Sequence, residues 1–182
     1  MTEDSTISYI TIMNYRLGVI LIGSLVAGVF AQSREHAEAS IRLRLPAPPS
    51  VVFPLFGPVR ESEWAPHWNP TMLYPLKGSQ QAGAVFTTRQ HDQDVVWVLT
   101  TYDESALRVS YVIVRPGKSA DQLDISLKAL GGGETEAIVT HRLTSLSEGA
   151  DGSVKDFARE FPLERDHWEH AISGRLRELT GH

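Results

Sequence analysis

Between residues 71 and 147 the chain consists of short stretches in which apolar and polar residues alternate, separated only by tight turns. A period of two places apolar side chains on one face of a strand and polar side chains on the other. Turns such as Pro116-Gly117-Lys118 are too short for the helical crossover that parallel strands need. The segment is therefore predicted to be an antiparallel meander, with strands at 72–76, 84–89, 95–102, 107–114, 123–127 and 135–146.

One further strand, at 40–45, precedes this meander. There Ile41, Leu43 and Leu45 alternate with polar residues, and the prolines that follow end the strand. Ser50 is then predicted to cap a short apolar helix over 51–56. After the break at Gly57-Pro58 the sequence predicts a second short helix, over 59–65.

The C-terminal stretch changes to helical spacing. From Val154 to Leu179 its apolar residues recur every three or four positions, and Pro162 is expected to kink the helix. A long helix can bury such a stripe against a curved sheet, which gives two layers around one core. The predicted fold class is thus α+β: a curved antiparallel sheet of about seven strands, two short helices after the first strand, and a long C-terminal helix packed across the concave face.

An apolar, uncharged stretch at 17–31 follows Arg16 near the N-terminus. It is short for a membrane span of about 20 residues but suits a signal peptide, and Val29 and Ala31 favour cleavage after Ala31. The acidic residues near Met1 do not suit a signal peptide, so Met13 is the alternative start. An uncleaved anchor and a short buried helix are the other interpretations.

These features divide the chain into 1–31, a signal peptide or anchor, and 32–182, the folded domain. The predicted location is periplasmic or secreted, with anchoring in the membrane by residues 17–31 as the alternative. Contact with a membrane is expected only through that segment, if it is not cleaved. No pattern in the sequence indicates an oligomeric state.

Composition excludes several classes of function. The net charge is −5, with 17 basic and 22 acidic residues interspersed, which argues against a nucleic-acid partner. The absence of cysteine excludes thiolate nucleophiles and cysteine zinc sites. Glu164-x-x-His167 lacks the second, facing motif of a carboxylate metal site, and the glycines at 131–133 lack the residues of a phosphate loop. The sequence therefore predicts neither a metal nor a cofactor.

The order of these elements, together with Glu61-x-x-Trp64-Ala65-x-x-Trp68, resembles the helix-grip superfamily called SRPBCC or START-like, including bacterial proteins grouped with polyketide cyclases and lipid-transport domains. Further matching marks are Tyr74-Pro75, Gly83-x-x-Phe86, Trp97, Tyr111-x-x-x-x-Pro116-Gly117 and Trp168. The resemblance runs from about residue 41 to residue 179. It implies a START-like domain with a cavity between sheet and helix for a lipid, a polyketide or another apolar metabolite.

Aromatic and histidine side chains are the candidate contacts for a small hydrophobic ligand, because they offer apolar area and a polar atom that can orient it. The predicted ligand-binding residues are Trp64, His67, Trp68, Tyr74, Phe86, Trp97, Tyr111, His141, Phe157, Phe161 and Trp168. The alternative is that the aromatic residues fill the core, that His67 lies in an exposed loop and that His141 is a hydrogen-bonded core residue.

Two functions follow from these observations. The favoured one is an exported or anchored protein that binds a hydrophobic molecule without transforming it, because no constellation of nucleophile, base and oxyanion donors is present and no catalytic residue is assigned. The alternative is a cyclase- or aromatase-type enzyme in which His67, Glu61 or His141 moves protons on a polyketide-like substrate. A structural or protein-binding role is a third possibility.

Overall fold

The computed structural model describes residues 33–77, 80–90 and 92–181. The predicted signal segment 1–31, the alternative start at Met13 and the cleavage site before Gln32 lie outside these residues. Seven strands form one antiparallel sheet in the order β1-β7-β6-β5-β4-β3-β2. Their bounds are β1 His36–Leu45, β2 Thr71–Tyr74, β3 Val85–Gln90, β4 Gln93–Asp103, β5 Arg108–Arg115, β6 Ser119–Ala129 and β7 Thr135–Ser145.

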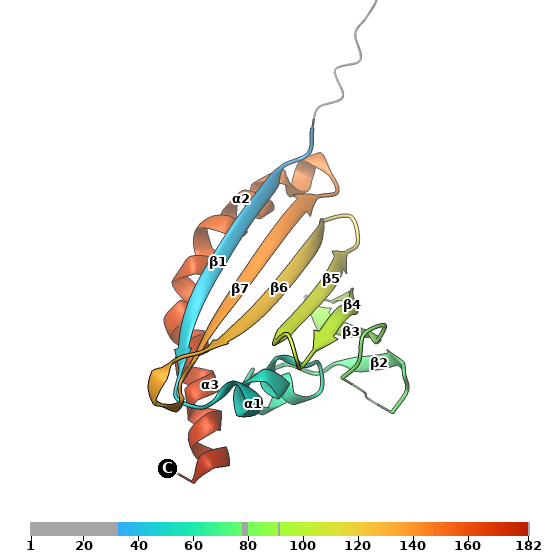
Figure 1. Cartoon of the computed structure of the whole chain (residues 1–182). Coiled ribbons are helices and arrows are strands. Elements are labelled where there is room, and N and C mark those ends of the chain that lie inside the picture. Colours follow the sequence, from blue (N-terminus) through green and yellow to red (C-terminus); the bar gives the residue numbers. More distant parts are fainter. Residues whose placement is uncertain (1–32, 78–79, 91, 182) are drawn as a thin grey trace, which may run out of the picture. The chain divides into compact units, whose positions relative to one another are not determined.

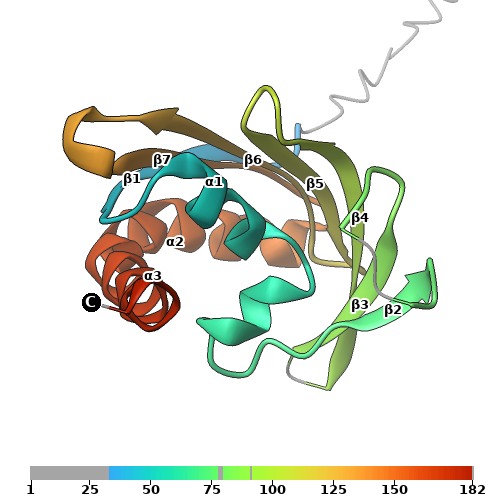
Figure 2. The same ribbon diagram turned by 60° about the horizontal axis from the view of Figure 1, so that its bottom comes forward.

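Sequence neighbours pair throughout this sheet, except that β1 lies beside β7. The segment between β1 and β2 holds α1 (Pro49–Val52) and two 3₁₀ helices, η1 (Phe53–Phe56) and η2 (Arg60–Glu63). After β7 follow η4 (Glu148–Ala150), α2 (Asp151–Glu160), η5 (Phe161–Glu164) and α3 (Arg165–Thr180), while η3 (Gly131–Gly133) joins β6 to β7. Figures 1 and 2 show α2 and α3 along the concave face, with α1 and its neighbours at one end. The predicted helix-grip architecture is confirmed.

Several predicted boundaries are wrong in detail. Strand β1 begins at His36, where the ring Nδ1 lies 2.9 Å from Oγ1 of Thr144, because pairing with β7 continues beyond the clearly alternating residues. Ser50 lies inside α1 and does not cap it, since Pro48 occupies the capping position without a side-chain hydrogen bond. Pro49 occupies the first helical position, which suits proline because its missing N–H is not needed there. The helix predicted at 59–65 is only the single turn η2.

Pro162 interrupts the C-terminal helix as predicted. It lies in η5, which separates α2 from α3, because proline cannot supply the N–H of a continuous α-helix. The apolar stripe is formed by Val154, Phe161, Ile172 and Leu176, all buried, and α2, η5 and α3 all pack against β1. Over the part of the chain that the structure describes, no helix is both long and apolar enough to cross a membrane.

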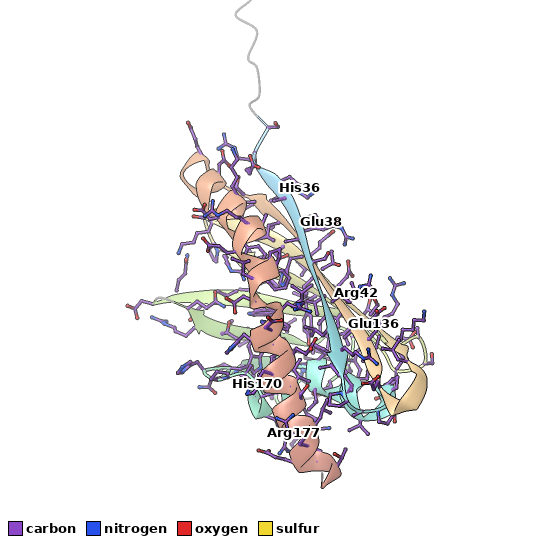
Figure 3. The ribbon with its side chains drawn as sticks, turned by 90° about the vertical axis from the view of Figure 1, so that its left-hand side faces the viewer. His36, Glu38, Arg42, Glu136, His170 and Arg177 are labelled. Atoms are coloured by element: carbon purple, nitrogen blue, oxygen red, sulfur yellow. The ribbon has the colours of Figure 1, made fainter. Side chains whose placement is uncertain are left out.

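The two faces of the sheet differ as the alternation predicts. Inward positions such as Leu43, Phe86 and Ile113 are completely buried. Figure 3 shows the outer face at β1 and β7, where the labelled side chains of Arg42 and Glu136 lie on the side away from α3. These two form an ion pair at 2.5 Å between Nη1 and Oε1. Any ligand site in the core must therefore lie between the concave face and the helices.

Candidate functional site

Four predicted ligand contacts form one packed aromatic cluster. Phe86 of β3 and Trp97 of β4 are stacked, with ring centroids 5.7 Å apart. Trp68 and Tyr111 pack edge-on against both of these rings, at centroid distances between 5.1 and 6.2 Å. Neighbouring strands bring the rings together because all three strand residues occupy inward positions.

The polar atoms of this cluster are used within the protein. Nε1 of Trp97 donates a hydrogen bond to Oγ1 of Thr88 at 2.9 Å. Nε1 of Trp68 and the hydroxyl of Tyr111 each donate to a backbone carbonyl oxygen of segment 56–58, at 2.7 and 2.8 Å. Burial, and next the carboxylate of Glu61, raises the pKa of Tyr111 well above its ordinary value. These rings consequently hold segment 56–58 against the sheet, and their contact with a ligand stays a prediction.

A second row of rings lies along the C-terminal helices. Phe157 and Phe161 are stacked at 5.3 Å, and both pack edge-on against the ring of His141 on β7. Trp168 continues the row, 6.0 Å from Phe161 and 5.2 Å from Trp64, which follows η2. The row therefore links the two ends of the space between the helices and the sheet.

The larger of two cavities along this row opens where α2 begins. It has a volume of about 340 Å³, and its lining includes Phe157, whose ring packs against that of His141. Leu143, Val154 and Ala150 give it an apolar wall. Its complete lining is Gln90, Arg115, Lys118, Ser119, Leu143, Ala150, Ser153, Val154 and Phe157.

A buried charged group lies beside this cavity. Nδ1 of His141 is 2.8 Å from Oδ2 of Asp121, which is completely buried, and Nη1 of Arg115 is 3.7 Å from the same oxygen. The 2.8 Å distance is that of a hydrogen bond between the imidazole and the carboxyl group. Burial lowers the pKa of Arg115, and the carboxylate of Asp121 opposes that shift. His141 is thus a hydrogen-bonded core histidine that also forms part of the aromatic row.

A smaller cavity, of about 250 Å³, lies between η2 and α3 at the other end of the row. Trp64 and Trp168 form its aromatic walls, and Glu61 of η2 and His167 of α3 contribute polar groups. Burial raises the pKa of the Glu61 carboxyl to about 8, so this group is largely protonated at neutral pH. A carboxyl that keeps its proton can donate it, which makes Glu61 a candidate for acid–base chemistry.

Only some of the predicted ligand-binding residues line one of these two cavities. Trp64, Phe157 and Trp168 line one or other of the two cavities, and the remaining predicted residues are not among those linings. His67 is exposed in the loop after η2, and Tyr74 on β2 is 61% exposed. His67 is predicted from its position between Trp64 and Trp68, and Tyr74 as an aromatic residue that matches the family resemblance; both stay predictions.

Sequence reasoning missed the charged residues at the larger cavity. Arg115 follows Tyr111 and Ile113 in the inward register of β5, and Asp121 precedes Leu123 in the inward register of β6. Charged residues at inward positions of alternating strands are uncommon, so their presence at these two positions indicates a buried polar site. Around the Glu164-x-x-His167 spacing, Glu164, Asp166, His167 and His170 are exposed, and Glu169 is half-buried.

No known protein family and no curated protein matches this sequence. Norcoclaurine synthase from Thalictrum flavum, solved with dopamine and hydroxybenzaldehyde, superposes with a TM-score of 0.61 at 12% identity, over 94% of this chain and 98% of that one. A START superfamily protein from Mycobacterium smegmatis gives 0.59 at 16%, over 78% and 98%. Ara h 8.0201 gives 0.56 at 15%, over 76% and 96%. The chain therefore has the START/SRPBCC-like helix-grip fold that its sequence resembles.

Proposed function

We propose that the protein binds one small hydrophobic molecule between α2 and the concave face of the sheet, without transforming it. The observation that carries this proposal is the cavity of about 340 Å³ with Leu143, Val154 and Phe157 in its wall. Ligand sites are typically apolar concavities of about 300–1,000 Å³ with a few polar groups. The volume suits a small lipid, a polyketide-like metabolite or another apolar molecule of similar size. Norcoclaurine synthase, which shares the fold, has been solved with two small aromatic compounds.

A tryptophan placed in the mouth of the cavity should block this binding. Ser153 is exposed and lines the cavity, so Ser153→Trp can fill the space without disturbing the core. We expect the neutral fluorescent probe N-phenyl-1-naphthylamine to bind the variant about tenfold more weakly than the wild type, or not at all. Asp156→Trp, an exposed position on α2 that does not line the cavity, is the matched control. Equal probe affinity in all three proteins would contradict the proposal.

A second function, an enzyme of the cyclase or aromatase type, is favoured by one observation at the smaller cavity. There the Glu61 carboxyl, with a pKa raised to about 8, faces the space between Trp64 and Trp168. A proton donor with a pKa near the working pH is the group that such a reaction needs. With a β-polyketone probe, turnover that Glu61→Gln abolishes while probe binding persists would establish this function. Binding without turnover in the wild type would leave the carrier function in place.

We also propose that the protein is exported, or anchored through residues 17–31, and that it works outside the cytoplasm. The apolar stretch after Arg16 supports this location. Mass spectrometry of the full-length gene product from its host's envelope fraction should find a chain that begins at Gln32, or an intact chain in the membrane. An intact chain in the cytoplasmic fraction would contradict export.

A further inference from the structure

The rim of the larger cavity is basic. Arg115 ends β5 in the inward register, and its side chain is 21% exposed. Lys118, in the turn between β5 and β6, is exposed beside it. Of the nine lining residues these two are the ionisable ones, and neither is acidic. The cavity thus combines an apolar wall with a positively charged entrance.

One nitrogen of the Arg115 guanidinium has no hydrogen-bond partner in the described part of the chain. A guanidinium has five N–H donors in a planar fork that fits an oxyanion. Within the described part of the chain, Nη1 is buried without a hydrogen-bond partner, and the ion-pair contact with Oδ2 of Asp121 is long, at 3.7 Å. Buried polar atoms normally have a partner, and Oδ1 of Asp121 lacks one too, so the hydrogen bonds of this buried pair are not all satisfied within the described part of the chain.

Asp121 compensates part of the positive charge of this rim, because it forms an ion pair with Arg115, whereas no ion pair of Lys118 is found among the described residues. Its Oδ2 is already 2.8 Å from Nδ1 of His141, and the residue is not among those that line the larger cavity. Oδ2 of Asp121 thus contacts both a histidine and an arginine, while Oδ1 is buried without a hydrogen-bond partner in the described part of the chain. Both basic residues line the cavity, with Arg115 21% exposed and Lys118 exposed, so a ligand there can reach them.

Together these observations define the chemistry of the ligand, given the proposed hydrophobic binding function. We propose that the cavity takes an amphipathic acid, whose apolar body lies against Leu143, Val154 and Phe157 and whose carboxylate pairs with Arg115 near Lys118. Bidentate pairs between arginine and a carboxylate are among the strong hydrogen bonds in proteins, and partial burial limits their screening by salt. Serines 119 and 153 lie in the same lining and can hydrogen-bond a carboxylate oxygen.

Paired ligands of equal length test this assignment on the wild-type protein. Decanoic acid and 1-decanol are titrated against bound N-phenyl-1-naphthylamine at neutral pH and low salt. We expect the acid to bind about tenfold more tightly than the alcohol, or better, as a charge-assisted pair predicts. Equal affinities, or tighter binding of the alcohol, would overturn the assignment of an acidic ligand. Failure of both ligands and of the probe would instead contradict the proposed function itself.

Substitutions at Arg115 and Lys118 test which positive charge makes the protein prefer the acid over the alcohol. Arg115→Gln should lower the affinity for decanoic acid to that for 1-decanol and leave the alcohol unchanged. Because this variant also removes a partner of Asp121, the exposed Lys118→Gln serves as a second variant without that risk, with an expected loss of about threefold for the acid alone. Lys128→Gln, exposed on β6 and outside the cavity lining, is the control. Acid selectivity that survives both rim variants would contradict the proposal.

Discussion

A Glu61→Gln variant should keep stability that the wild-type protein loses as the pH rises from about 5 to about 8. Burial raises the pKa of the Glu61 carboxyl to about 8, against an ordinary value of 4.5. Between these values the folded state holds one more proton than the unfolded state, so the free energy of unfolding falls by about 1.4 kcal/mol per pH unit. The contribution of this group is fully present below pH 4.5 and is lost as the pH passes through about 8.

Urea unfolding at about pH 5.5 and about pH 7.5 measures this effect, and the wild type should lose roughly 3 kcal/mol relative to the variant. Glu63→Gln, two residues away, is the matched control. Hydrogen bonding to Arg60 and Arg175 lowers the pKa of Glu63 to about 2. Replacing Glu63 should therefore change the free energy of unfolding by the same amount at both pH values. Parallel pH dependence of the wild type and Glu61→Gln would mean that the Glu61 carboxyl is hydrated.

The second large effect concerns the packed aromatic cluster, where Phe86→Ala should cost about 3–5 kcal/mol of stability. Phe86 is completely buried, stacks on Trp97 and is contacted edge-on by Trp68 and Tyr111. Hydrogen bonds hold all three of these neighbouring side chains in place, so they cannot move to fill the void that the missing ring would leave. The midpoint of urea unfolding gives the change in stability, provided that the slope of the transition is unaltered.

Tyr74→Ala is the control for that measurement. Tyr74 is 61% exposed on the edge strand β2, and its truncation should change stability by less than about 0.5 kcal/mol. If Phe86→Ala costs less than about 1 kcal/mol, the rings around it enclose space and are not close-packed. The ligand cavity would then extend beneath β3 and β4, away from α2.

The sheet could be predicted from the sequence because period-two alternation and short turns leave few arrangements. The alternation of Ile41, Leu43 and Leu45 predicts β1 from residue 40 onward. Its first residues are not predicted because Ala39 is too small to give a strong apolar signal. Pairing of β1 with β7 joins residues that are far apart in the sequence, from Leu45 with Thr135 to His36 with Thr144, and sequence spacing holds no information on that register. The interruption at Pro162 was predictable from the chemistry of a single residue.

The candidate site could be predicted only in part. Phe157 and Trp168 were found because aromatic residues at helical spacing indicate an inward face. Arg115, by contrast, lines the cavity only because residues of β5, β6, β7 and α2 meet there, and each element alone gives no sign of it. The environment of Glu61 likewise depends on α3, which is about 100 residues away in the sequence, folding back over η2.

Binding between α2 and the sheet is tested most directly by isotope-filtered NMR of the protein with decanoic acid. We expect intermolecular NOEs from the alkyl chain to the methyl groups of Leu143 and Val154 and to the ring of Phe157, all in the lining of the larger cavity. NOEs confined to exposed apolar residues such as Leu76 and Leu163, or none at all under saturating ligand, would contradict ligand binding at this place.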